Sequence, residues 1–277
     1  MDTLIHLSAV LRATAIAWCF SLSIMTAVEL TLPRDRYPVS GRLAGVMFWT
    51  LWLSANATAV ALFHLLWRSL GIQPIVLLPT RAAWAGPLAC VIAPLLGSIV
   101  YDFFFYWCHR AQHRWLWKYH AVHHSITELS AVNAFHHISE PLFQIALIAI
   151  PSSLIAADLT VAMPIVIILL QLQAAFIHSS TTLHLGPLRW LLVDNRFHRI
   201  HHSVEHRHFD YNFGAMTTIW DRLFGTAWMP AKDEWPETGI AEVGQPATLR
   251  DWVMLPADYT AAVEQDPVVA RRTVPAA

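Results

Sequence analysis

Charged residues are scarce in this chain. Only 13% of its 277 residues are Asp, Glu, Lys or Arg, whereas 56% are hydrophobic, and the mean hydropathy is +0.44. Soluble domains carry nearer a quarter charged residues. Lysine is restricted to Lys118 and Lys232 and the net charge is −1, so there is no basic surface to neutralise nucleic-acid phosphates. The composition therefore predicts a membrane protein and excludes a nucleic-acid partner.

Cysteine pairs and two common metal-binding motifs are also lacking. Cys19, Cys90 and Cys108 lie far apart without a CxxC pair, so we expect buried thiols rather than disulfides or a thiolate metal site. The HExxH motif of zinc metalloproteases is absent. The Glu-x-x-His pairs of soluble di-iron bundles are absent from the histidine clusters. The N-terminus has no basic n-region or clear cleavage site, so no signal peptide is expected.

Long apolar runs, by contrast, recur along the chain. A bilayer span needs about 20 mostly apolar residues, and three runs fit: about 8–30, 44–67 and 84–107. Two more, about 141–157 and 160–177, are separated only by Asp158 and Leu159. We expect them to form a tight hairpin whose ends return to one side of the membrane. The predicted fold class is all-α, a polytopic integral membrane helical bundle.

This pattern divides the chain into three regions. Residues 1–83 are expected to form an N-terminal transmembrane region of two spans, with the short segment 71–79 at the interface. Residues 84–230 would form the catalytic region, with the third span, the membrane hairpin 141–178 and a closing histidine block. Residues 231–277, rich in proline and acidic residues, are expected to be an irregular, soluble C-terminal tail.

Arginine and lysine in the short loops predict the orientation. The cations on the side of the histidine clusters are Arg34, Arg36, Arg42, Arg110, Arg114 and Lys118, against Arg68 and Arg81 on the other side. This bias predicts that the histidine-rich part caps the bundle on its cytoplasmic face. The preference for arginine over lysine hints at a GC-rich bacterial genome, and hence at a bacterial inner membrane.

Three short histidine clusters are the most informative motif. They supply eight histidines, which we expect to form the catalytic metal site: His109, His113, His120, His123, His124, His198, His201 and His202. Residues three and four apart share a helix face, whereas the adjacent histidine of each HxxHH cluster turns away by about 100°. Imidazole is the commonest metal ligand. The spacing therefore predicts a cap that binds two metal ions.

Three kinds of function fit such a site. Two-metal sites serve hydrolysis or oxygen chemistry, and an all-histidine di-iron site beside a bilayer suits oxidation of lipid C–H bonds by O2. A membrane zinc-dependent hydrolase would use the same ligands as Lewis-acid ligands. A metal transporter is a third alternative, although it would need His and acidic residues spaced through the spans rather than gathered outside them.

Two stretches around the clusters carry a family resemblance. The first is DFFFYWCHRAQHRWLWKYHAVHHS at 102–125; the second comprises FHRIHHS at 197–203, DYNFG at 210–214 and IWDRLFGT at 219–226. Over about residues 100–226 the chain resembles the fatty acid hydroxylase superfamily, which holds sterol desaturases, C4-methylsterol oxidases, alkylglycerol monooxygenases and fatty acid hydroxylases. The resemblance implies an integral membrane di-iron enzyme that hydroxylates or desaturates a lipid with O2.

The resemblance also implies further ligands and an electron donor. His178 stands where the family has a histidine at the end of the returning hairpin helix, and His137 resembles the histidine of an Arg-x-His-Pro-x-Glu element, although Phe135 and Ile138 replace its Arg and Pro. The histidines without a firm counterpart are His136, His184, His206 and His208. Because no cytochrome b5 domain or Gly-rich nucleotide motif is present, we expect NAD(P)H electrons to arrive through a separate carrier, cytochrome b5-like or a ferredoxin.

Two polar residues within the motifs have open roles. Asp102 precedes His109 by two helical turns, so it either orients an imidazole or is a buried group bonded elsewhere. Asn212 either supports a ligand or caps a turn before Gly214.

Overall fold

Two long apolar helices make up the N-terminal region. The structure, a computed structural model, describes residues 2–78, 89–157 and 163–265. α1 (Asp2–Thr31) and α2 (Val39–Ser69) coincide with the first two predicted spans, and both are long and apolar enough to cross a membrane. Only 28% of the apolar window of α1 and 17% of that of α2 are buried. Most of their hydrophobic side chains therefore face outward, as lipid-facing helices require and core helices do not.

α3 (Ala89–Trp115) carries the described part of the predicted third span, whereas residues 84–88 lie outside the described residues. The helix does not stop at residue 107 but continues for two turns. His109 and His113 therefore lie on the same rigid helix as the apolar segment. One residue later, α4 (Trp117–His124) begins and carries the second cluster.

The predicted hairpin is bent in its first arm. That arm consists of α5 (Glu140–Gln144), a π-helical turn η2 (Ile145–Ala149) and α6 (Ile150–Ser153). These helical residues span only about 21 Å at 1.5 Å per residue, less than the roughly 30 Å of a hydrocarbon core. The second arm is α7 (Met163–His178), and the predicted turn at Asp158 and Leu159 lies outside the described residues.

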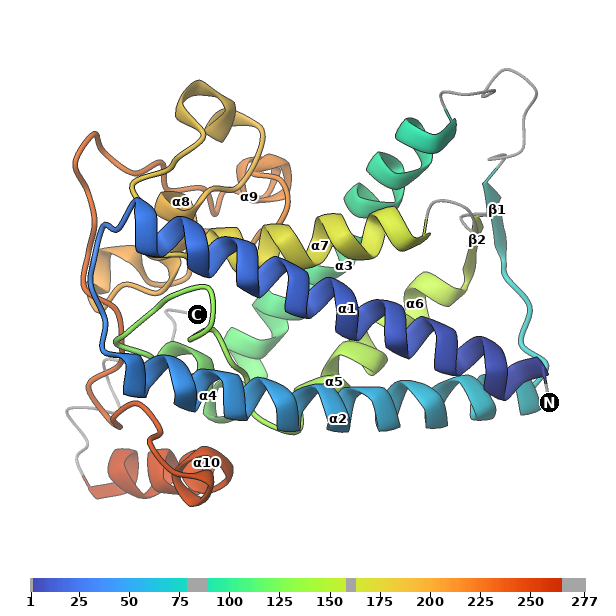
Figure 1. Cartoon of the computed structure of the whole chain (residues 1–277), viewed down its shortest axis with the longest axis horizontal. Helices are drawn as coiled ribbons and strands as arrows, with labels where there is room; N and C mark the ends of the chain where they lie inside the picture. The colour runs from blue at the N-terminus through green and yellow to red at the C-terminus, as the bar shows by residue number, and fades with distance from the viewer. Residues whose placement is uncertain (1, 79–88, 158–162, 266–277) are drawn as a thin grey trace.

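A short parallel strand pair, which the sequence did not indicate, departs from the all-helical expectation. β1 (Val76–Leu78) pairs with β2 (Ile155–Ala157) in the register Val76↔Ile155. This strand pair joins the 71–79 segment, which was expected at the membrane interface, to the end of the hairpin's first arm. The strands lie at the opposite end of the molecule from the short helices α4, α8 and α9 (Figure 1).

The short helices gather at one end of the long ones. The turn η3 (Gly186–Trp190) precedes α8 (Asn195–His201), and the turn η4 (His206–His208) lies between α8 and α9 (Ile219–Leu223). α1 packs along α7, and α8 packs against the C-terminal part of α7 (Figure 1). Segments far apart in the sequence, 109–124 and 178–202, are thereby brought to the same end of the bundle.

The C-terminal region contains a helix, so the prediction of an irregular tail is wrong over these residues. α10 (Leu249–Gln265) packs against α4. Trp252, Leu255 and Tyr259 follow helical spacing and are buried, and Trp252 stacks on Phe48 of α2 with ring centroids 5.2 Å apart. The acidic residues Asp258 and Glu264 of this helix are exposed, whereas Pro256 is buried with Trp252 and Leu255 and does not stop the helix.

A buried carboxylate fixes two loops beside the short helices. Glu29 of α1 is 1% exposed. Its carboxylate accepts hydrogen bonds from the backbone N–H groups of Ala131 and Ser180, each at 2.8 Å, and pairs with Arg42 at 2.6 Å. Because buried charges are stable only when paired and hydrogen-bonded, this arrangement holds the 131 and 180 loops against α1.

Candidate metal centre

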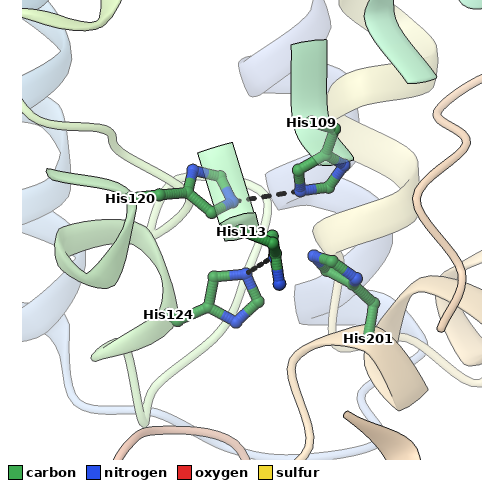
Figure 2. Close-up of side chains that lie close together, drawn as sticks. All are labelled: His109, His113, His120, His124 and His201. Carbon is green, nitrogen blue, oxygen red and sulfur yellow. Dashed lines mark hydrogen bonds between the residues drawn. The ribbon is translucent and has the colours of Figure 1, made fainter. Parts of the chain in front are cut away.

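Nine histidines converge in two adjoining groups. In each group, one ring nitrogen of every member lies within 4.8 Å of those of all the others. The five-histidine group comprises His109, His113, His120, His124 and His201. The four-histidine group comprises His123, His178, His198 and His202. Figure 2 shows the five-histidine group, with side chains from α3, α4 and α8 pointing toward one shared space.

Helical spacing explains how the clusters are shared between the groups. In α4 the i,i+4 pair His120 and His124 joins the five-histidine group, whereas His123 turns to the other group. The third cluster does the reverse, since the pair His198 and His202 joins the four-histidine group and His201 the five-histidine group. The adjacent histidine of each HxxHH cluster thus reaches the second group, in accord with its expected rotation.

Backbone carbonyls fix the tautomer of several rings. His109 Nδ1 lies 2.8 Å from Phe213 O, and His178 Nδ1 lies 2.7 Å from Ala174 O. Because a carbonyl oxygen only accepts, each Nδ1 must carry the proton and donate it. The Nε2 atoms of these neutral rings are then free lone pairs, which is the arrangement that metal-ligating histidines show. His201 and His123 have the same kind of support, from Tyr211 O at 2.8 Å and Phe135 O at 3.3 Å.

The distances between ring nitrogens are those expected of imidazoles that bind a shared metal ion. His123 Nε2 and His178 Nε2 are 3.1 Å apart although the carbonyls leave neither with a proton, so two lone pairs face each other. Similar Nε2–Nε2 distances join His178 to His198 (2.9 Å) and His109 to His120 (3.0 Å). Two ligands at about 2.1 Å from one ion and about 90° apart would be separated by about 3 Å. Among the nine histidines, the buried ring nitrogens without a hydrogen-bond partner are His120 Nδ1, His198 Nδ1, His201 Nε2 and His202 Nδ1.

Burial also keeps these imidazoles neutral. Desolvation, reinforced by neighbouring imidazoles, holds the pKa of His109, His120 and His123 well below the ordinary value of 6.5. The same causes act on the pKa of His124, His198, His201 and His202. A neutral imidazole is the form that binds a metal, so these histidines are ready to act as ligands near neutral pH.

The structure does not bring His137 to either group. Its Nδ1 lies 2.7 Å from Ser139 Oγ and its Nε2 lies 3.2 Å from Val253 O, so both ring nitrogens have partners elsewhere. His136 turns inward instead and stacks on His123, with ring centroids 3.9 Å apart. This geometry argues against the ligand role predicted for His137.

A buried carboxylic acid, Glu140, lies beside His136 at the edge of the two groups. His136, His120 and Glu140 form a further close set of possible ligands, and His136 Nδ1 lies 4.0 Å from Glu140 Oε1. Gln112 Nε2 donates to both carboxylate oxygens, at 2.6 and 2.7 Å. Burial raises the pKa of Glu140 to about 7. The sequence analysis left His136 without a role, because residues 134–137 form no regular element whose period could assign a face.

Asp102 and Asn212 act on the backbone rather than on imidazoles. Asp102 accepts hydrogen bonds from the N–H groups of residues 215, 216 and 217 at 2.8–3.1 Å. Asn212 Nδ2 donates to Phe197 O and Trp228 O, and its Oδ1 accepts from Trp228 N. Asn212 has a φ of 62°, which Asn tolerates better than most residues. Both side chains therefore fix the loop whose carbonyls orient His109 and His201.

The remaining histidines lie outside the groups. His184 and His206 are exposed. His208 is buried, with Nδ1 2.8 Å from Ser203 Oγ and Nε2 3.2 Å from Glu234 Oε1. Their placement indicates structural or surface roles.

A cavity of about 240 Å³ leads from the apolar helices to the histidines. Its wall includes three tryptophans of α1 and α2 (Trp18, Trp49 and Trp52), aromatic residues of α3, and apolar residues of α7. The histidines in its wall are His109, His123, His136, His178 and His198. Both groups therefore border the cavity, and a molecule within it would contact apolar side chains along most of its length.

The sequence is similar to several known lipid-modifying enzymes. An ornithine lipid hydroxylase of Rhizobium tropici is 34% identical over 57% of this chain, an alkylglycerol monooxygenase of Xenopus tropicalis is 30% identical over 48%, and a fatty acid hydroxylase of a Lecanicillium species is 30% identical over 70%. The aligned regions cover 48%, 30% and 56% of those proteins' own lengths, so the chain spans about half of them or less. No solved structure matches significantly.

The family comparison agrees with the motifs. The sequence model of the fatty acid hydroxylase family matches residues 94–226, a range that begins within α3 and ends just after α9. It includes all nine histidines of the two groups and the hairpin between them. The chain therefore contains a fatty acid hydroxylase family domain.

Proposed function

We propose that this protein is a multi-pass membrane oxygenase that uses two iron ions and O2 to hydroxylate or desaturate a lipid. The observation that carries the proposal is the cavity, because it connects outward-facing apolar helices to histidines of both groups. The relatives are named for the hydroxylation of ornithine lipids and fatty acids and for the monooxygenation of alkylglycerols. Their shared feature is a lipid substrate.

The nine histidines would hold the metal ions and set their surroundings. Iron bound there would supply O2 activation and hydrogen abstraction from carbon, with electrons derived from NAD(P)H through a separate cytochrome b5-like or ferredoxin carrier. The chain's own contribution is positioning. Carbonyl acceptors fix the imidazole tautomers, and the apolar cavity wall orients a lipid carbon against the histidines while limiting access of water.

We further propose that the site lies at the cytoplasmic face of a bacterial inner membrane. The arginine and lysine bias of the short loops supports this orientation. The outward-facing apolar surfaces of α1 and α2 support insertion in a bilayer. A cysteine-accessibility assay on intact cells would test it, since Cys substituted for exposed Arg114 should be labelled only after the inner membrane is permeabilised.

The central test combines metal analysis with lipid analysis. Protein purified without oxygen should contain two iron ions per chain and consume O2 when given a reductant. Cells that express the gene should contain a lipid that has gained one oxygen or lost two hydrogens. His123→Ala and His201→Ala should each abolish that product, whereas His184→Ala, at an exposed histidine outside both groups, should not. Zinc in a fully active preparation would overturn the iron assignment in favour of a hydrolase.

A further inference from the structure

Several polar groups in the cavity wall have no hydrogen-bond partner among the described residues. They include the indole N–H groups of Trp49 and Trp52, and the carboxamide of a glutamine on α7. Among the described residues, three glutamines line the cavity: Gln144, Gln171 and Gln173. Gln173 donates to Val193 O at 2.7 Å and to Ala215 O at 3.0 Å, and Gln144 donates to Glu140 at 3.4 Å. The Gln171 carboxamide has no hydrogen-bond partner among the residues that the structure describes.

Gln171 is half-buried and lies among apolar residues. It lies within α7, whose other residues are apolar apart from Gln173 and His178. An amide placed in apolar surroundings without a hydrogen bond costs on the order of 1–3 kcal/mol, and polar groups at membrane depth are usually retained for function. Gln171 therefore points to a ligand that completes its hydrogen bonds.

The helix geometry links this amide to the metal centre. Gln171 and His178 are seven residues apart, which places them on the same face of α7 about 10 Å from each other along its axis. Ile167, Leu170 and Ala174 lie between or beside them in the same cavity wall. A lipid chain lying along this stripe would have one end at the amide and another carbon at the histidines.

The chemistry of the wall restricts the group that binds there. Among the described residues, no Asp, Glu, Lys or Arg side chain lines the cavity. A formal charge at the Gln171 end, away from the histidines that would hold the metal ions, would lack a counterion in surroundings of low polarity, which is strongly unfavourable. A carboxamide, in contrast, both donates and accepts hydrogen bonds. It suits an uncharged amide, ester or hydroxyl group.

We propose that Gln171 binds an uncharged amide, ester or hydroxyl group of the lipid and so determines which carbon lies at the histidines. The choice of the carbon that is oxidised rests on the proposed function, whereas the binding of such a group by Gln171 does not. The charged part of a substrate head group stays outside the cavity. Gln171 is thus a specificity-determining residue rather than a metal ligand.

Binding can be measured without turnover. Retention of radiolabelled palmitamide on the purified, detergent-solubilised chain would be competed with unlabelled palmitamide, hexadecane or palmitate. We expect the wild-type chain to prefer palmitamide over both competitors. Gln171→Met keeps the side-chain length but removes the amide, and should lower palmitamide affinity roughly 2- to 12-fold. Gln171→Asn should restore part of the preference. Gln73→Met, the same change at an exposed residue outside the cavity, should have no effect.

A second measurement separates specificity from folding. If wild-type cells make an oxidised lipid, Gln171→Met should raise KM and shift the position of oxidation along the chain while the metal content stays unchanged. Unchanged palmitamide preference in Gln171→Met and Gln171→Asn would overturn the proposal. If Gln171→Met lost the preference for palmitamide but wild-type cells made no oxidised lipid, the binding role of Gln171 would stand and the oxygenase assignment would fall. The two failures are therefore distinguishable.

Discussion

The two histidine groups consist of the same kind of side chain but are supported differently. In the five-histidine group, His109 and His201 donate to Phe213 O and Tyr211 O, two carbonyls of one loop. In the four-histidine group, His178 donates to Ala174 O within its own helix. The cavity wall includes three members of the four-histidine group but only one of the other. One group therefore depends on the 211–213 loop, whereas the other is supported by α7 and by Phe135 O and contributes more histidines to the cavity wall.

Truncation of Trp252 should affect both groups and produce the largest loss of stability. Trp252 is fully buried, stacks on Phe48, and donates its Nε1–H to His136 O at 2.8 Å. It belongs to α10, which packs on α4, the helix that supplies histidines to both groups. Trp252→Ala should lower the free energy of unfolding by about 3–5 kcal/mol, measured by thermal unfolding in detergent.

The matched control is Trp115→Ala, because Trp115 is 77% exposed. It should change stability by less than about 0.5 kcal/mol. Equal effects at the two tryptophans would show that α10 contributes little to the fold. If Trp252→Ala weakened metal binding at only one of the two groups, the result would contradict the position of α4 between them.

Removal of the Asn212 side chain should weaken the five-histidine group selectively. Asn212 lies between the two residues whose carbonyls orient His201 and His109, and its side chain makes three hydrogen bonds, one of them buried and two partly buried. Asn212→Ala should leave buried backbone groups unsatisfied, at about 1–3 kcal/mol each, and lower metal affinity at that group by about 10- to 100-fold. Metal titration should then show one strong and one weakened site.

Asn212→Gly separates the side chain from the backbone. Glycine adopts the φ of 62° without strain but makes none of the side-chain hydrogen bonds. It should therefore weaken the same site while destabilising the fold less than alanine does. If both sites weakened equally in either variant, the two groups would not be independently supported.

Filling the cavity should affect catalysis but not metal binding. Ala174 lies in the cavity wall one helical turn before His178. Ala174→Leu adds three carbon atoms there and should displace the substrate carbon, lowering kcat/KM by about 10- to 100-fold. The metal content should stay unchanged. Ile168→Phe adds the same number of carbons on the outward face of α7, where Ile168 is 41% exposed, and should leave activity intact.

The sequence predicts the parts of this site that follow from helical period. The spacing of His120, His123 and His124 indicates both the shared face and the rotated neighbour, and the groups divide accordingly. The apolar runs likewise predict the C-terminal ends of α1 (Asp2–Thr31) and α2 (Val39–Ser69) to within two residues, although both helices begin earlier than the predicted runs at 8 and 44. In both cases, the information lies within one element.

The remainder depends on contacts between distant segments. Asp102 lies on the correct helix, yet its partners are backbone N–H groups 113 to 115 residues away. The burial of Trp252 requires α2 and α4 as partners. Residues 231–277 taken alone therefore show only a composition rich in proline and acidic residues. Such contacts leave no periodic signal in the sequence.

The smallest effect is expected at His137, and it distinguishes the structure from the family pattern. His137→Ala removes contacts with Ser139 and Val253 O and should cost about 0.5–1.5 kcal/mol of stability, with both metal sites retained. His136→Ala removes a ring that stacks on His123 of the four-histidine group and should lower activity even if both ions stay bound. Metal analysis and lipid turnover of the two variants, expressed side by side, check both expectations. If His137→Ala lost a metal ion and His136→Ala did not, His137 would be the ligand and His136 would lie outside the metal centre. The 134–139 segment would then adopt the register of the family motif in the metal-loaded protein.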